Sequence, residues 1–307
     1  MPAFDIIGDI HGHAEPLECL LRRLGYRDTG GAYRHPAGRK VVFLGDFIDR
    51  GPAVRRVLHV LRDMVEAGVA ISVMGNHEYN ALGYHTLDET GKPLRPRNVK
   101  NVVQHQATLA QFFDHRAEWR GHLRWFRSLP LFLDLGDFRV AHAAWHQPLI
   151  NRLRTDRIDA QLLRKSIDKR TIAHHAIEAL LKGIEIPLPR GALFRDKDGI
   201  ARREIRVKWW MNPKDRTYAE LSLQPSTSVP KRSVPRRLSH KIPGYARTEK
   251  PVFVGHYWLN HNPPRPLATN VACLDYSVAK GGFLCAYRWE EGDAGLRRGR
   301  FVTAPSG

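Results

Sequence analysis

The first 80 residues repeat one pattern that strongly limits the possible folds: a short apolar run that ends at a glycine. The runs are residues 3–7, 40–44 and 69–74, and helix-length segments with one apolar face follow the first two, at 15–24 and 53–67. Strands that alternate with helices form a mostly parallel sheet covered by helices, so the chain is predicted to be an α/β protein. Ligands of such sheets bind beyond the carboxyl ends of the strands. We therefore expect the three glycine-containing loops to meet at one functional edge.

Each of these loops carries groups that bind metal ions. Residues 8–12 place Asp9 and His11 two positions apart, so both side chains can reach one ion beyond a strand end. Residues 45–51 add two carboxylates and a guanidinium, and residues 75–78 add an amide, an imidazole and a carboxylate. The flanking glycines allow the backbone to turn tightly. Mixed oxygen and nitrogen donors suit divalent manganese, iron or zinc rather than a cysteine-rich structural zinc site.

Each loop alone also has a simpler explanation. Asp49 beside Arg50 is compatible with a local surface ion pair, and Asn76 with His77 after a glycine is compatible with ordinary turn chemistry. Three such loops at three successive predicted strand ends favour a shared site over three coincidences.

The rest of the chain is less regular. Residues 98–126 have helical character, residues 131–133 and 138–142 read as short strands, and residues 156–181 predict a pair of helices. Repeated prolines break the basic stretch 188–250, so no long helix is expected there. Strand-like runs resume at 251–255, 272–275 and 283–287. We interpret 1–307 as a single domain with an irregular, basic insertion at about 150–250.

Composition bears on partners and location. The formal net charge is +18, from 49 Lys and Arg against 31 Asp and Glu, which fits either a merely soluble surface or an anionic partner. An anionic partner could be a phosphorylated substrate, a nucleotide, or a nucleic acid bound by the insertion. The apolar runs are too short to cross a bilayer, so no membrane partner is expected. Three cysteines without CxxC spacing, and a first functional group as early as Asp9, predict a cytoplasmic protein without a cleaved signal.

The three loop sequences GDIHGH (8–13), GDFIDRGP (45–52) and GNHE (75–78) resemble the signatures of the calcineurin-like metallophosphoesterases. Asp-Arg-Gly in the second and His-Glu in the third resemble the phosphoprotein phosphatase branch, which includes Ser/Thr protein phosphatases and diadenosine tetraphosphatases. His142 and His256 stand in motifs similar to the two remaining metal-histidine motifs of the family. The resemblance implies a β-sandwich flanked by helices and a phosphoester hydrolase with two divalent ions, manganese first and iron or zinc as alternatives.

Carried over by position, the resemblance implies a set of metal ligands: Asp9, His11, Asp46 as the bridge, Asn76, His142 and His256. Trp258 stands where many members have a further histidine, which would leave the first metal with more water ligands. Two ions about 3.5–4 Å apart would convert a bridging water to hydroxide and hold the phosphoryl oxygens for in-line attack.

Three further residues are expected to act beside the metals. Arg50, together with Asn76, would bind phosphate oxygens, and His77 held by Asp49 would protonate the leaving group. The first substrate hypothesis is a phosphomonoesterase of the Ser/Thr protein phosphatase type. The alternative is a bis(5'-nucleosyl)-tetraphosphatase, or another hydrolase of nucleotides or nucleic-acid ends.

Several residues remain open at this point. Glu78 could tune the metal ligands or accept a backbone hydrogen bond, and His13 and His146 lie near motifs without further support. The pairs Trp209-Trp210 and Tyr257-Trp258 fit packing better than stacking on a base or an aromatic side chain. Residues 231–232 and 236–237 fit a solvated basic loop, or a second grip on an extended anion.

Overall fold

The computed structural model describes residues 3–195, 199–224 and 226–306. The three predicted runs form β1 (Phe4–Ile7), β4 (Lys40–Phe43) and β5 (Ala70–Ser72), which lie parallel and adjacent in that order. Antiparallel strands extend this sheet beyond β1: β14 (Asp275–Tyr276), β15 (Phe283–Trp289) and β16 (Phe301–Pro305). The predicted parallel core of the sheet is therefore confirmed.

A second sheet has the strand order β13-β12-β7-β6. Its strands are β6 (Phe132–Asp134), β7 (Arg139–Ala141), β12 (Val252–Val254) and β13 (Val271–Cys273). β12 is parallel to both β7 and β13. Two further strands, β2 (Arg27–Asp28) and β3 (Tyr33–Arg34), form a separate hairpin.

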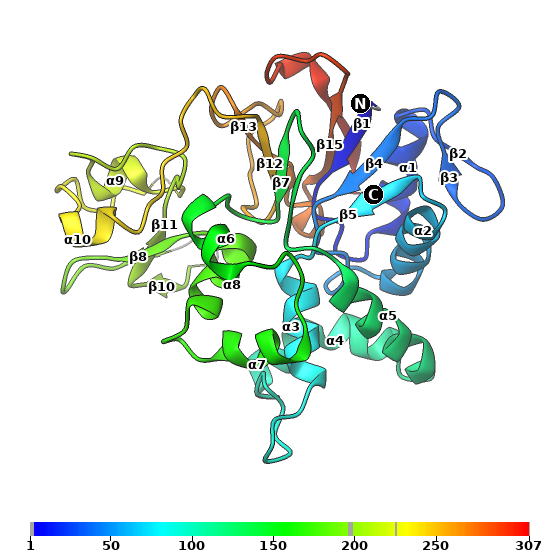
Figure 1. Ribbon diagram of the computed structural model, residues 1–307, viewed down its shortest axis with the longest axis horizontal. Helices are drawn as coiled ribbons and strands as arrows, with labels where there is room; N and C mark the ends of the chain where they lie inside the picture. Colours follow the sequence, from blue (N-terminus) through cyan, green and yellow to red (C-terminus); the bar gives the residue numbers. More distant parts are fainter. Residues whose placement is uncertain (1–2, 196–198, 225, 307) are drawn as a thin grey trace.

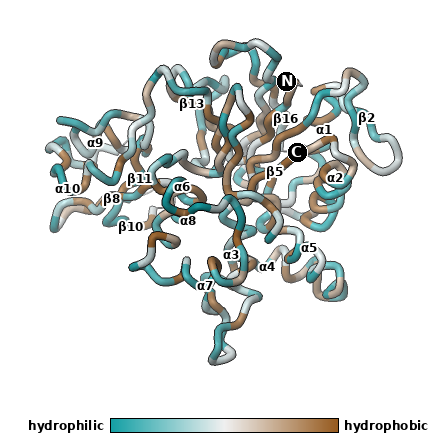
Figure 2. The backbone as a smooth tube through the Cα atoms, in the orientation of Figure 1, coloured by the Kyte–Doolittle hydropathy of each residue, from teal (hydrophilic) through white to brown (hydrophobic). Residues whose placement is uncertain are grey.

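The two sheets pack face to face (Figure 1). Alternate residues of β1, Phe4 and Ile6, share one apolar cluster with Phe138 and Phe253 of the second sheet. The rings of Phe4 and Phe138 lie 5.7 Å apart in an edge-to-face contact. Helices α1 (Ala14–Arg23) and α2 (Val54–Glu66) turn their apolar sides to the other face of the first sheet (Figure 2). This is the β-sandwich flanked by helices that the resemblance implied.

The middle of the chain is helical, as predicted. Residues 98–126 contain α4 (Val99–Gln111) and most of α5 (Arg116–Ser128), after α3 (Asn76–His85). The predicted pair at 156–181 corresponds to α7 (Ala160–Ile167) and α8 (Ile172–Lys182), preceded by α6 (Gln147–Leu153). No described helix is both long and apolar enough to cross a membrane.

The sequence predicts the insertion at about 150–250, but helices α6 to α8 continue to residue 182, so we use the name insertion for 184–250 only. Its described residues, 184–195, 199–224 and 226–250, contain paired strands. β8 (Glu185–Pro187) pairs with β11 (Glu204–Arg206), and β9 (Phe194–Arg195) pairs with β10 (Ala201–Arg202). Its helices α9 (Tyr218–Leu221) and α10 (Arg236–Ser239) are short, as the prolines predict. Ile186, Ile205 and Trp209 are fully buried in the larger apolar cluster. Paired strands and this burial, rather than long helices, hold the insertion on the sandwich.

Candidate metal centre and catalytic cleft

The six predicted ligands leave the carboxyl ends of five strands in two sheets. Asp9 and His11 follow β1, Asp46 follows β4 and Asn76 follows β5, whereas His142 and His256 follow β7 and β12. All six side chains are buried. The sandwich thus brings residues that are up to 247 positions apart to one edge, and the Asp9 carboxylate accepts the His256 backbone N–H at 3.0 Å.

Asp46 lies at the middle of this group. Its Oδ2 is 3.4 Å from Nε2 of His142 and 3.6 Å from Nε2 of His11. Asn76 Oδ1 lies 3.2 Å from the same His142 nitrogen. Two sets of possible ligand atoms lie within 4.8 Å of one another, His11–Asp46–His77 and Asp46–His142–His256. A carboxylate shared by both sets is what a bridge between two ions requires.

The imidazoles are oriented for metal binding. Nδ1 of His11 lies 3.0 Å from the carbonyl of Ile48, and Nδ1 of His142 lies 2.7 Å from that of Leu44. Such bonds fix the tautomer and turn Nε2 toward the centre. Among the described residues, the buried Nε2 atoms of His11 and His256 have no hydrogen-bond partner. Buried nitrogens left in this way fit residues that bind divalent cations.

The local charges of His11, His256 and Asp46 agree with this assignment, whereas burial and then Asp275 raise the pKa of Asp9 well above its usual value. Burial and then His77 lower the pKa of His11 to about 3, and burial holds the pKa of His256 well below its usual value, so both offer a lone pair. Burial opposes ionisation of Asp46, but His142 and His77 outweigh it and hold the pKa of Asp46 well below its usual range. Burial also opposes protonation of His142, yet Asp46 and Asp9 raise its pKa to about 10. A cation at the centre would replace that proton.

The ligand loops have an unusual backbone. His11, Asp46, Asp49, Arg50, His256 and Trp258 all have a positive φ, between 46° and 71°. Non-glycine residues rarely adopt this conformation, and when they do they cluster at functional sites. Two glycines make room for the ligands: a Cβ at Gly75 would lie 2.3 Å from Oδ1 of Asp46, and one at Gly255 would lie 2.0 Å from Oδ1 of Asp9.

Comparison with known proteins decides the family. Residues 3–183 match the calcineurin-like phosphoesterases. The chain belongs to that family. Its histidine and aspartate groups are able to bind metal, and the family chemistry makes the protein a phosphoester hydrolase.

The similar curated proteins include asymmetrical bis(5'-nucleosyl)-tetraphosphatases PrpE. That of Oceanobacillus iheyensis is 31% identical over 150 residues, which are 48% of this chain and 58% of that protein. That of Bacillus subtilis is 32% identical over 143 residues, 46% of this chain and 57% of that protein. The match thus spans less than two thirds of these relatives.

Solved structures share the fold. A protein serine/threonine phosphatase from Saccharomyces cerevisiae superposes with a TM-score of 0.54 at 15% identity, covering 99% of this chain and 83% of that chain. A cold-active protein tyrosine phosphatase gives a TM-score of 0.53 at 19% identity, with 99% and 78% covered.

Asp49, His77 and Arg50, the three residues expected to act beside the metals, lie close to one another in this phosphoesterase. Oδ2 of Asp49 lies 2.5 Å from Nδ1 of His77, and Nη2 of Arg50 lies 3.4 Å from the opposite ring nitrogen, Nε2. Burial opposes ionisation of Asp49, but hydrogen bonds from His105 and His77 keep its pKa well below the usual value. Asp49 is therefore a carboxylate that orients the His77 ring.

Several residues around this dyad carry no signal in the sequence. His105 Nδ1 lies 2.7 Å from Oδ1 of Asp49, and Thr108 Oγ1 donates to the same oxygen at 2.6 Å. His105 is therefore buried support, not surface. Gln104 Nε2 lies 3.4 Å from Nε2 of His77, so a substrate oxygen that reaches His77 would meet Gln104 and Arg50 as well.

Glu78 acts on the backbone. Its carboxylate accepts the N–H groups of Asp46, Phe47 and Gly75 at 2.8, 2.9 and 3.0 Å. One side chain thus ties the second loop to the third. Burial, followed by the charge of Asp46, raises the pKa of Glu78 to about 7.

The aromatic residues singled out in the sequence lie in two different environments. Trp209 and Tyr257 are buried, and both donate to the carbonyl of Ala143, as the packing interpretation expects. Trp258 instead lines the cleft, with the Arg50 guanidinium 4.0 Å and Lys280 Nζ 4.3 Å from its ring centroid. Asp275, which also carries no signal in the sequence, accepts the Trp258 N–H at 2.7 Å.

Other candidates lie outside this centre. His146 caps α6 and accepts the N–H of Leu149. His13 stands at the start of α1, and residues 231–232 and 236–237 do not line the cleft. A separate group, His59 with Glu118 and His122, has Arg55 Nε at 2.9 and 3.1 Å from the two Glu118 oxygens, so a cation already binds that carboxylate.

Proposed function

We propose that this phosphoesterase hydrolyses bis(5'-nucleosyl) polyphosphates, cutting diadenosine tetraphosphate asymmetrically with two divalent ions, Mn²⁺ in preference to iron or zinc. One observation carries the proposal: the charge of the cleft above the metal ligands. This cleft has a volume of about 490 Å³. Among the described residues that line it, one is a carboxylate, Asp46, and seven are basic. The basic residues are Arg50, Arg95, Lys100, Lys182, Arg202, Arg206 and Lys280.

That excess of positive charge suits a long phosphate chain better than a single phosphate group. A phosphomonoester has about two negative charges to neutralise, whereas each phosphate in a polyphosphate chain adds a charge. Guanidinium groups bind phosphate oxygens in pairs, and concentrated positive charge attracts anions into a cleft. The similarity to bis(5'-nucleosyl)-tetraphosphatases supports the same substrate class. The phosphoprotein hypothesis is supported by a shared fold and by loop motifs of a branch that contains both kinds of enzyme, neither of which separates the two substrate classes.

The chain's own residues divide the work as follows. Asp9, His11, Asp46, Asn76, His142 and His256 would hold the ions, which supply charge neutralisation and an activated water. Arg50 and Asn76 hold the oxygens of the attacked phosphorus. The water oxygen forms the new P–O bond, and the bond to the leaving oxygen breaks. His77, oriented by Asp49, gives its proton to that oxygen.

A substrate comparison tests the proposal. With Mn²⁺ present, turnover of diadenosine tetraphosphate is compared with turnover of a phosphoserine peptide and a 3'-phosphorylated oligonucleotide. We expect the dinucleotide to be strongly preferred, with ATP and AMP as products. Two ADP molecules would contradict asymmetric cleavage, and preference for the peptide would restore the phosphatase hypothesis.

A further inference from the structure

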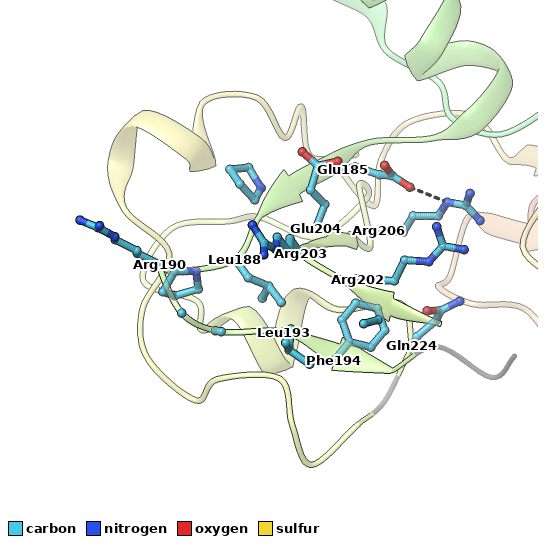
Figure 3. A pocket seen from close by; sticks show the side chains of 15 residues that line it. Glu185, Leu188, Arg190, Leu193, Phe194, Arg202, Arg203, Glu204, Arg206 and Gln224 are labelled. Carbon is cyan, nitrogen blue, oxygen red and sulfur yellow. Dashed lines mark hydrogen bonds and ion pairs between the residues drawn. The ribbon is translucent and has the colours of Figure 1, made fainter. Parts of the chain in front are cut away.

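A second cavity, of about 730 Å³, lies within the insertion. Its walls come from the β8–β11 and β9–β10 strand pairs and from the segment between β8 and β9 (Figure 3). We call it the insertion cavity. Its size falls within the range of sites that enclose small molecules. The family match ends at residue 183, so this cavity lies wholly outside the matched region.

The insertion cavity adjoins the cleft. Arg202, Arg206 and Gln224 line both spaces. In Figure 3, the side chains of Arg202 and Arg206 extend in the same direction, whereas Arg190 points away. Oε1 of Glu185 accepts a hydrogen bond from Nε of Arg206 at 3.1 Å, which fixes that arginine at the boundary. A phosphate chain that begins at the metal ligands would therefore pass two guanidinium groups on its way out.

The wall of the cavity changes character beyond those arginines. Leu188 and Phe194 are buried there, and Leu193 is 48% exposed. Glu204 and Arg203 are exposed polar groups on the same lining. An apolar surface suits the face of a base, and a carboxylate accepts hydrogen bonds from hydroxyl or amino groups. A nucleoside combines both kinds of surface in one compact group.

We infer that the insertion cavity binds the nucleoside at the far end of the substrate, with Arg202 and Arg206 holding the phosphates between the two sites. This inference rests on the proposed function for the identity of the substrate. In this interpretation, the insertion makes the enzyme select dinucleotides over simple phosphates. An uncharged extended peptide would gain little from the two arginines that line both the cleft and the insertion cavity.

Binding to the metal-free protein tests the inference without turnover. Calorimetry in the presence of a chelator compares diadenosine tetraphosphate with inorganic tripolyphosphate, which lacks a nucleoside. Leu193→Glu should lower affinity for the dinucleotide about tenfold more than affinity for tripolyphosphate, since losing one apolar contact in a pocket costs about that factor. Leu87→Glu is the matched control, because Leu87 is also 48% exposed and does not line the cavity. Arg202→Ala should weaken both ligands, with Arg237→Ala as its control.

The outcomes separate the two proposals. If Leu193→Glu and Leu87→Glu behave alike, or if wild type binds both ligands equally, the cavity does not hold a nucleoside. Hydrolysis of diadenosine tetraphosphate by the Mn²⁺-loaded protein would then leave the proposed function intact. Selective binding without hydrolysis would support the cavity and overturn the proposed function. A larger effect of Leu193→Glu on an oligonucleotide than on the dinucleotide would point to a nucleic acid and also overturn the inference.

Discussion

The metal centre and the insertion are built in opposite ways. Ligands of the metal centre are buried, sit on strained loops at strand ends, and are fixed by hydrogen bonds to the backbone. In the insertion, two- and three-residue strands carry the exposed Arg202 and the half-buried Arg206 beside an apolar wall. Bond cleavage requires fixed geometry, because small displacements are costly. Selection of a substrate tolerates longer side chains at a more open surface. The contrast supports our proposals that the first region carries out the chemistry and that the second selects the substrate.

Removal of the metal ions should have the largest effect, and it tests whether the first region is a metal centre. Chelation should abolish hydrolysis, and adding Mn²⁺ at 100 times its Kd should stabilise the fold by about 2.7 kcal/mol. The stabilisation arises because the ion satisfies the buried nitrogens of His11 and His256. Thermal unfolding with and without Mn²⁺ measures the effect. Identical melting curves would show that the ligand cluster binds no ion.

Asp46→Asn removes the shared carboxylate. Loss of a residue that only supports a metal ligand costs about 10–100-fold, so loss of the bridge should lower kcat by more than about 100-fold. Asp114→Asn, at an exposed aspartate, serves as the control. Full activity of Asp46→Asn would disprove the bridging role.

The loss of rate caused by His77→Ala should depend on the leaving group of the substrate. A general acid contributes about 10²–10⁴-fold, so the rate on an alkyl phosphate should fall at least about 100-fold. p-Nitrophenyl phosphate, whose leaving group needs little protonation, should lose far less. Steady-state rates on both substrates give the ratio. Equal losses would exclude His77 as the acid and leave it with a positioning role beside Asp49.

Arg202→Ala tests whether the insertion contributes to substrate binding. One hydrogen bond to a charged group contributes about 1.5–3 kcal/mol, so the KM for diadenosine tetraphosphate should rise at least about tenfold. The change in kcat should be smaller, in contrast to Asp46→Asn. Arg237→Ala, on α10, is the charge-matched control. A fall in kcat with an unchanged KM would place Arg202 in the chemistry instead.

The two regions also differ in how far the sequence predicts them. A local pattern, an apolar strand that ends at a glycine, precedes each of Asp9, His11, Asp46 and Asn76. Their position at one edge of the sheet can therefore be predicted from the sequence. His142 and His256 stand in shorter motifs, and the family resemblance was needed to include them. The structure brings all six to one edge of the sandwich, although the Asp9 carboxylate belongs to neither of the two sets of possible ligand atoms that share Asp46.

The features that cannot be predicted from the sequence depend on contacts between residues that are far apart in the chain. His105 lies 56 positions from Asp49, and nothing in a surface-like helix distinguishes it from other histidines. The strand pairs of the insertion are too short for an alternating pattern to stand out, and prolines conceal them further. The insertion cavity follows from that pairing, so only the fold reveals it.

The left-handed backbone at Arg50 has an evolutionary consequence. A non-glycine residue in this conformation costs about 1–3 kcal/mol, which the surrounding contacts must offset. Glycine would relieve that cost, so Arg50→Gly is expected to unfold at a slightly higher temperature while losing activity. Selection for robustness alone would remove this arginine. Its presence at φ 69° is thus consistent with the proposed role of Arg50 in binding phosphate, which a glycine at this position could not fill.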